Sequence, residues 1–184
     1  MEQKRCKMAS RSLNDLVPEV KQKAEKVLEV CDSVGLDLLI YCTLRALQEQ
    51  SKLYRQSRSW HEIKTKILKF KNRGFSYLAD ILDGVGPCSG PHVTNAAPGE
   101  SWHNYGEAWD AVVLVGGKPA WKYFDAKEEW DAYGECVVQV GMTWAGNWTR
   151  FKERPHAQLR KGSNPLKVFD PDKIHEILAS NKLI

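Results

Sequence analysis

The sequence predicts an α+β domain with a small antiparallel sheet flanked by helices. Helical and strand patterns follow one another in no regular alternation, which argues against the parallel sheet of an alternating α/β chain. Hydrophobic residues make up 42% of the chain and charged residues 27%, as in an ordinary soluble globular protein. A length of 184 residues suits one compact domain with its own core. We therefore expect a single domain over residues 1–184.

The first elements are a helix and a strand. Apolar residues recur at helical spacing, with Pro18 near the start and Gly35 as the stop, and predict a helix over about 15–34. The next segment, LDLLIYCT at 36–43, is short and apolar. It predicts a buried strand.

More helix and a long loop follow. We expect a second helix over about 46–57, and residues 60–83 have a helical pattern that Gly74 interrupts. The following DGVGPCSGPHVTNAAPG is rich in glycine, proline and asparagine, which is typical of a loop. Residues 59–93 together are the expected insertion or lid.

The second half predicts another strand and two helices. EAWDAVVLV at 107–115 alternates and then becomes apolar, as expected for a strand that enters the core, and VGGKP predicts a turn after it. Asp125 and Glu128 are a candidate capping pair for a helix that Gly141 ends. The dipeptide at 170–171, Asp-Pro, predicts the start of a last helix. TWAGNW and RFKERPHAQL are expected as further strand and loop.

Charge and hydropathy exclude several functions. The net charge is only +4, and lysine and arginine are scattered among acids, so we expect no nucleic-acid partner. No stretch approaches the roughly 18 apolar residues of a membrane span, and the start MEQKRCKMASRS lacks the apolar segment of a signal peptide. We expect a chain made in the cytoplasm without membrane insertion, whose mild positive charge suits an anionic partner such as a cell wall.

The five cysteines, at positions 6, 31, 42, 88 and 136, include no Cys-x-x-Cys pair. They predict buried thiols in a chain made in a reducing compartment. Cys88 and His92, four residues apart, could suggest a second metal site. Two ligands in a loop are weak evidence for one.

Two short segments have the parts of a catalytic zinc site. SWHNYGEAWD places His103 and Asp110 seven residues apart, and KERPHAQ places Glu153 three residues before His156. Catalytic zinc takes three protein ligands, and a nearby carboxylate can act as general base in hydrolysis. In a regular strand residues 153 and 156 would face opposite sides, so one shared site requires a bend at Pro155. Alternatively, the first pair caps a turn and His156 is a core histidine.

SWHNYGEAWD resembles the Ser-x-His-x-x-Gly-x-Ala-x-Asp signature of zinc peptidases related to D-Ala-D-Ala carboxypeptidases, in particular the L-alanyl-D-glutamate peptidases among bacteriophage endolysins. ERPHAQ resembles the second half of that signature. VTNAAPGESWHNYG, LRALQEQSKLYRQSR and MTWAGNW are similar to further segments of the family, in the family's order over about residues 12–160. The resemblance implies a Hedgehog/DD-peptidase-like fold.

The resemblance also implies one zinc ion per chain and a role for eight residues. For Arg45 the implied role is to stabilise the oxyanion, and the alternative is a surface arginine at a helix start. Ser101 could equally shape a turn, and Trp148 could belong to the core. The implied set is the metal ligands His103, Asp110 and His156, the catalytic Glu153 and Arg45, and the substrate-binding Ser101, Gln50 and Trp148.

The implied activity is hydrolysis of the L-Ala-D-Glu bond of the peptidoglycan stem peptide by a monomeric, endolysin-like enzyme, which reaches the wall when a partner protein opens the membrane. Three features depart from the closest endolysin pattern: Glu153 replaces Asp, Ala157 replaces a common aromatic, and residues 59–93 are longer. A D-Ala-D-Ala carboxypeptidase or dipeptidase therefore stays open as an alternative. So does a wall-binding module that keeps the zinc fold without turnover.

Overall fold

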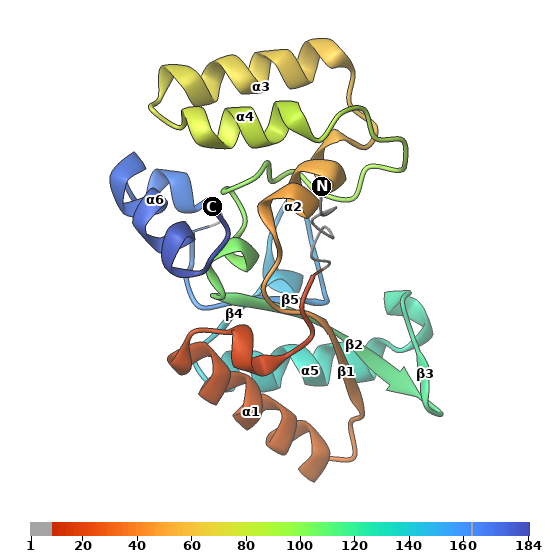
Figure 1. The fold of residues 1–184 in the computed structure, drawn as a ribbon. Coiled ribbons are helices and arrows are strands. Elements are labelled where there is room, and N and C mark those ends of the chain that lie inside the picture. The colour runs from red at the N-terminus through yellow and green to blue at the C-terminus, as the bar shows by residue number, and fades with distance from the viewer. Residues whose placement is uncertain (1–8, 163) are drawn as a thin grey trace, which may run out of the picture. The chain divides into compact units, whose positions relative to one another are not determined.

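The computed structural model describes residues 9–162 and 164–184, so the predictions on the first eight residues, including Cys6, lie outside it. The chain divides into two compact units, each built from separate stretches (Figure 1). The sheet unit comprises residues 10–44 and 106–161. The helical unit comprises residues 45–105 and the described part of 162–184, together with residue 9.

The sheet unit combines two long helices with short antiparallel strands. The strand order is β1-β2-β5-β4, and β3 forms a hairpin with β2. This confirms the predicted α+β class with a small antiparallel sheet. The elements are the helices α1 (Pro18–Ser33) and α5 (Lys127–Gln139), the strands β1 (Leu38–Cys42), β2 (Ala108–Val115), β3 (Lys118–Pro119), β4 (Thr143–Trp144) and β5 (His156–Gln158), and the 3-10 turns η1 (Leu13–Asp15), η3 (Tyr123–Asp125) and η4 (Ala145–Asn147).

Strand register places two of the three candidate ligands, Asp110 and His156, on one face of this sheet. Asp110 of β2 pairs with Cys42 of β1 on one side and with His156 of β5 on the other. Residues that pair directly share a face, and successive residues of a strand alternate. Trp109 and its partner Ala157 therefore belong to the opposite face.

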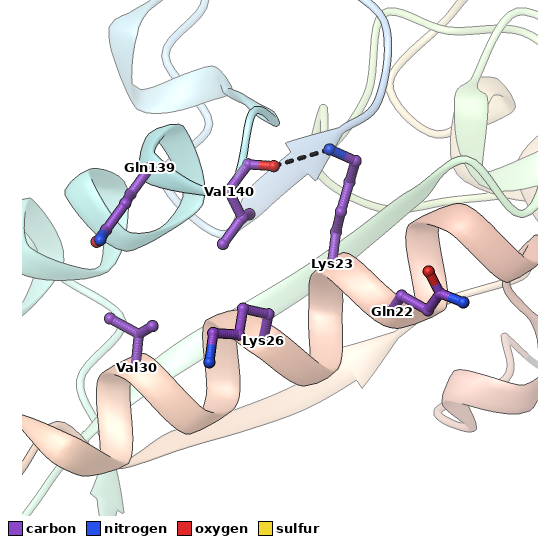
Figure 2. A pocket seen from close by; sticks show the side chains of 6 residues that line it. All are labelled: Gln22, Lys23, Lys26, Val30, Gln139 and Val140. Carbon is purple, nitrogen blue, oxygen red and sulfur yellow. Dashed lines mark hydrogen bonds between the residues drawn. The ribbon is translucent and has the colours of Figure 1, made fainter.

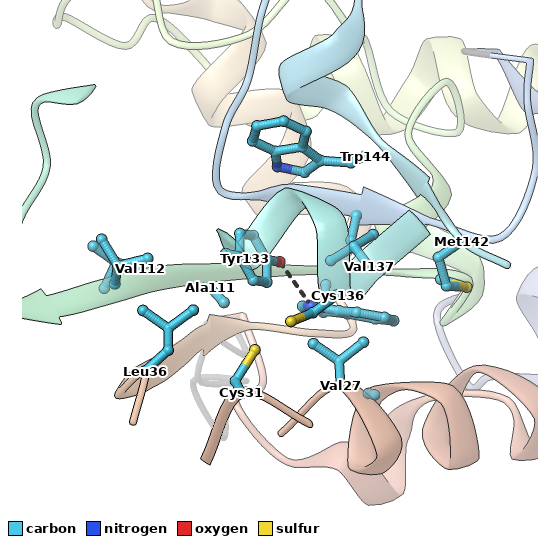
Figure 3. Packing of buried hydrophobic residues seen from close by; sticks show 14 of the residues in the cluster. Val27, Cys31, Leu36, Ala111, Val112, Tyr133, Cys136, Val137, Met142 and Trp144 are labelled. Atoms are coloured by element: carbon cyan, nitrogen blue, oxygen red, sulfur yellow. Dashed lines mark hydrogen bonds between the residues drawn. The ribbon is translucent and has the colours of Figure 1, made fainter. Parts of the chain in front are cut away.

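The face with Trp109 packs against α1 and α5 and forms the core of the sheet unit (Figure 3). Both helices contribute buried residues at helical spacing, as their sequence pattern predicts. The predicted burial of Cys31 and Cys136 is confirmed, with exposed fractions of 1% and 6%. The main helical contributions are Val20, Ala24, Val27 and Cys31 of α1 and Trp130, Tyr133, Cys136 and Val137 of α5.

Two details of the sequence prediction are wrong. The first strand is not buried, because β1 lies at the end of the strand order and Leu39 is 41% exposed. The second concerns the start of α5. Its N-cap is Ala126, which makes no side-chain capping bond, and Asp125 instead ends the turn η3, so the predicted pair with Glu128 does not cap the helix.

The helical unit follows the predicted pattern more closely. Gly74 has φ +83°, a conformation that favours glycine, and separates two helices as predicted. The last helix begins as expected, with Pro171 in its first turn and the Asp170 side chain accepting from the Lys173 N–H. The elements are α2 (Leu47–Arg55), α3 (Trp60–Asn72), α4 (Ser76–Gly84), η2 (Trp102–Tyr105), η5 (Pro165–Lys167) and α6 (Pro171–Ser180).

Residues 59–93, the predicted insertion, contain α3 and α4, which pack side by side (Figure 1). Ile63, Phe70 and Leu78 from this pair are at most 1% exposed. The Arg55 guanidinium of α2 donates to the carbonyl of Leu82 at 2.9 Å and so attaches α2 to the end of α4. The pair is thus part of the core of the helical unit. No described helix is both long and apolar enough to cross a membrane.

Candidate metal centre

Asp110 and His156 form the centre of the candidate site in the sheet unit. They lie opposite each other on neighbouring strands, with 3.0 Å between Asp110 Oδ1 and His156 Nδ1. Their side chains are only 11% and 10% exposed. The strand pairing therefore fixes a carboxylate and an imidazole side by side in a mostly buried place.

The second ring nitrogen of His156 is held by Gln158, a residue to which sequence reasoning gave no role. Gln158 is 1% exposed, and its amide nitrogen donates to the carbonyl of Arg160. Its Oε1 thus faces His156 Nε2, at 3.0 Å, and accepts a hydrogen bond from it. This leaves Nδ1 as the nitrogen beside Asp110, the arrangement in which an outer hydrogen bond orients a metal-binding histidine. The signal was the two-residue spacing, which puts both side chains on one face of a strand.

The charges around His156 favour its protonated form when no cation is present. Burial lowers the pKa of the ring, but the hydrogen bond to Asp110 and the negative charges of Asp110 and Glu153 together raise the pKa above its ordinary value. The same negative charges would attract a metal cation to the unprotonated ring.

Glu153 stands at the start of a tight turn that ends at His156. The His156 N–H donates to the Glu153 carbonyl at 3.1 Å, and the Glu153 N–H donates to the Ala145 carbonyl at 3.2 Å. Arg154 and Pro155 form the turn between them. The bend that the sequence required at Pro155 is therefore present.

Two further side chains flank this group. The ring of Trp148, which is partly buried, lies 5.7 Å from the His156 ring at an interplanar angle of 53°. Cys42 is 3% exposed, and its Sγ lies within 4.8 Å of a carboxylate oxygen of Asp110. The sequence predicted Cys42 only as a buried thiol, since its place opposite Asp110 depends on strand register.

In the helical unit the structure brings together Arg45 and His103, which are far apart in the sequence. The Arg45 N–H donates to the His103 carbonyl at 3.0 Å. Asn104, which is fully buried, donates from its side chain to the Arg45 carbonyl at 2.8 Å and accepts from the Gly99 N–H at 3.0 Å. His103 is 2% exposed and lies in η2. One side-chain amide thus joins the segments of both residues.

The Arg45 guanidinium is oriented by Gln50. Arg45 Nη1 donates to Gln50 Oε1 at 2.9 Å, and Gln50 Nε2 donates to the Ala96 carbonyl at 2.7 Å. Gln50 is fully buried, so both ends of its amide serve contacts within the protein. Ser101 is 9% exposed, and its carbonyl accepts from the Asn104 N–H at 3.0 Å at the start of η2.

The donor set of the sheet unit fits zinc. An imidazole nitrogen with an outer hydrogen bond and a carboxylate oxygen are typical ligands of catalytic zinc, whereas calcium and magnesium prefer oxygen ligands alone. The structure does not support the second metal site suggested by Cys88 and His92. Among the described residues, Cys88 and His92 belong to no group of three candidate ligands. His92 bonds to Ser57 and Asn95 instead.

An open depression on the sheet unit lies between α1 and α5 (Figure 2). Within it, Lys23 Nζ donates to the Val140 carbonyl at 2.8 Å. A lysine at this position satisfies a carbonyl at the end of α5 and complements the helix dipole. No predicted site residue lines the depression, which is formed by Gln22, Lys23, Lys26, Val30, Gln139 and Val140.

Comparison with known proteins adds sequence relatives. A family model described as D-alanyl-D-alanine carboxypeptidase matches residues 94–159, which include both histidine motifs. The peptidoglycan L-alanyl-D-glutamate endopeptidase CwlK of Bacillus subtilis is 32% identical over 152 residues, covering 79% of this chain and 74% of CwlK. An L-alanyl-D-glutamate peptidase of a Listeria phage is 24% identical over 153 residues, covering 82% of this chain and 41% of the phage protein.

Two solved structures are also similar to the chain. The L-Ala D-Glu endopeptidase ChiX of Serratia marcescens aligns with a TM-score of 0.43 and 17% identity over 83% of this chain and 89% of ChiX. A mutant of the vancomycin resistance D,D-pentapeptidase VanY, in complex with Zn(II), aligns with a TM-score of 0.48 and 12% identity over 95% of this chain and 86% of VanY. The evidence for family membership is the sequence likeness to CwlK.

Proposed function

Because the chain belongs to the D-alanyl-D-alanine carboxypeptidase family of metallopeptidases, we propose that it is a zinc peptidase that hydrolyses the L-Ala-D-Glu bond of the peptidoglycan stem peptide. Two relatives, CwlK and the Listeria phage protein, are named for this activity. The main structural support is the buried Asp110–His156 pair, with Glu153 at the start of the tight turn that leads to His156. The phage relative also supports an endolysin-like role in cell-wall degradation.

The proposed zinc ligands are His103, Asp110 and His156, with one ion per chain. Zinc, when bound, supplies Lewis acidity that polarises the scissile carbonyl and makes a water molecule easier to deprotonate. The sheet unit supplies two of these ligands, the Asp110 carboxylate and the His156 imidazole, at a fixed separation. Gln158 orients the His156 ring. Such preorganisation avoids the cost of arranging the ligands during each turnover.

The proposed chemistry then depends on Glu153 and Arg45. Glu153 takes a proton from the attacking water as its oxygen bonds to the carbonyl carbon of L-Ala, and gives the proton to the amine of D-Glu as the C–N bond breaks. Arg45, oriented by Gln50, donates to the oxyanion that develops on the carbonyl oxygen. We propose that Trp148 and Ser101 contact the peptide.

A D,D-carboxypeptidase that releases the terminal D-Ala is the second candidate. The description of the matching family model favours it, as does Glu153, the residue that the resemblance associates with the carboxypeptidase and dipeptidase branches. Both activities use the same residues in the same roles. A wall-binding module without turnover would not need Glu153.

The test is digestion of purified peptidoglycan, with the products identified. Cleavage of L-Ala-D-Glu exposes the amino group of D-Glu, whereas carboxypeptidase action releases free D-Ala. We expect about one zinc per chain, activity that is lost on chelation and restored by zinc, and a new amino terminus at D-Glu. The variant Glu153→Gln should keep zinc and lose roughly 10²- to 10⁴-fold in rate.

The matched control is Glu135→Gln, the same chemical change on the exposed side of α5. It should keep zinc and full activity. A Glu153→Gln protein as active as this control would contradict the mechanism. Free D-Ala as the main product would instead favour the second candidate, and zinc binding without any hydrolysis would favour the wall-binding module.

A further inference from the structure

Two core aromatic residues hold the turn of residues 153–156 by its backbone. Trp144 Nε1 donates to the carbonyl of Arg154 at 2.7 Å. The Tyr133 hydroxyl donates to the carbonyl of Pro155 at 3.2 Å. These two carbonyls belong to the residues between the proposed base and the proposed metal ligand. The indole N–H of Trp144 and the hydroxyl of Tyr133 therefore both bond to the backbone that connects the proposed base to the proposed metal ligand.

The hydroxyl of Tyr133 is itself oriented. Trp109 Nε1 donates to the Tyr133 oxygen at 3.1 Å, so the phenol proton is available for Pro155. Tyr133 is fully buried, and burial raises the pKa of its phenol well above the ordinary value. The Pro155 carbonyl also accepts from the Ala111 N–H of β2 at 3.0 Å. Donors in such a chain strengthen one another.

The indole of Trp144 is also fixed, because two glycines lie against it. A Cβ on Gly134 of α5 or on Gly146 of η4 would come within 2.3 Å of its ring. The ring therefore occupies space that side chains at these positions would need, and it has little room to turn. Its hydrogen bond to Arg154 starts from a rigid donor.

We propose that Tyr133 and Trp144 are positioning residues that set the placement of Glu153 relative to His156. The inference rests on the proposed function, in which Glu153 moves the proton and His156 binds zinc. Neither aromatic residue touches substrate in this proposal. They act through the backbone carbonyls of Arg154 and Pro155, so their loss should slow the proton transfers without removing zinc.

The first variant is Tyr133→Phe, which removes one oxygen atom and keeps the ring. We expect kcat to fall about 10- to 100-fold, the effect of a small misplacement of a catalytic group, with KM and zinc content unchanged. Trp144→Phe should act in the same direction. The matched control is Trp130→Phe. Like Tyr133, Trp130 lies on α5, and like Trp144 it donates from Nε1 to a backbone carbonyl. That carbonyl belongs to Ala120, outside the turn.

The melting temperature and the kcat–pH profile of the variants distinguish a positioning role of Tyr133 from a general contribution to stability. Tyr133→Phe and Trp130→Phe should both lower the melting temperature, but only Tyr133→Phe should lower kcat and displace the limb of the kcat–pH profile that reports Glu153. Equal kcat values for Tyr133→Phe and the unchanged enzyme would overturn the proposal. So would a kcat loss in Trp130→Phe as large as that in Tyr133→Phe, since the effect would then follow stability.

The failure of this inference can be told from a failure of the proposed function. If Glu153→Gln is inactive while Tyr133→Phe behaves like Trp130→Phe, only the positioning role is wrong. If Glu153→Gln is fully active, Glu153 is not the base, so the proposed mechanism is wrong and the positioning inference is overturned with it, whereas the bond that is cut is decided separately by the products of digestion.

Discussion

His103 and His156 are held in place by different kinds of contact. In the sheet unit, His156 lies in a strand, and the pairing of β5 with β2 places it beside Asp110. In the helical unit, His103 lies in a short 3-10 turn, and the buried amide of Asn104 joins this turn to Arg45. A sheet spreads the positioning over many backbone bonds. A turn concentrates it in one side chain, so single substitutions should have larger effects there.

The largest expected effect is that of Asn104→Ala. It leaves the Gly99 N–H and the Arg45 carbonyl without their side-chain partner in a buried place. Each such loss costs about 1–3 kcal/mol, so we expect the free energy of unfolding to fall by about 2–4 kcal/mol. The measurement is urea unfolding of the purified variant.

Gln158→Ala is the matched change in the sheet unit. It also removes a buried amide beside a candidate ligand, but His156 stays in its strand and the partly exposed Arg160 can bond to water. The loss should be smaller than for Asn104→Ala. Equal losses would mean that the two units do not differ in the way described.

The next effect concerns two helical glycines. Gly134→Ala in α5 would place a Cβ 2.3 Å from the Trp144 ring, and we expect a loss of about 1–3 kcal/mol from overpacking. Gly84→Ala at the end of α4 meets nothing within 4 Å and should instead stabilise by about 0.4–1 kcal/mol. Thermal unfolding of both variants gives the signs, and a stabilising Gly134→Ala would show that Trp144 can move.

The smallest effect is a pH dependence of the metal-free protein. The pKa of His156 is raised in the folded state. The charged pair of His156 and Asp110 therefore contributes its full stabilisation of the folded protein below the unfolded pKa of about 6.5, and this contribution is lost as pH rises through the folded pKa. The difference in unfolding free energy between the unchanged protein and Asp110→Asn should therefore shrink as pH rises. A difference between these two proteins that grows with pH would have the wrong sign.

Local sequence signals predicted much of the fold. The break at Gly74 and the helix start at Asp170 depend on neighbouring residues, and both are confirmed. The burial of β1 was predicted wrongly, because an apolar strand at the edge of a sheet looks the same in sequence as one in its centre. The missing cap of α5 has a similar cause: a suitable pair of side chains does not fix the backbone conformation of the residue between them.

The candidate site was predictable only where its residues lie close together in the sequence. The bend between Glu153 and His156 was required by a local spacing and is present. The contact of Tyr133 with Pro155 was not foreseen, because it depends on the packing of α5 against the sheet. The contact of Gln158 with His156 had a local signal, the two-residue spacing, that the sequence prediction did not use. The roles of the eight residues remain predictions, and Glu153→Gln tests that of the proposed base.

The burial of Cys31 against Cys136 has a consequence for handling the protein. Burial and the neighbouring Cys136 thiol raise the pKa of Cys31 to about 12, so almost none of it is thiolate at neutral pH. Alkylating reagents and peroxides attack the thiolate, so Cys31 should not react with them in the folded sheet unit. Cys88 is the one described thiol that is partly exposed, and a maleimide dye would therefore mark the loop after α4 of the helical unit first.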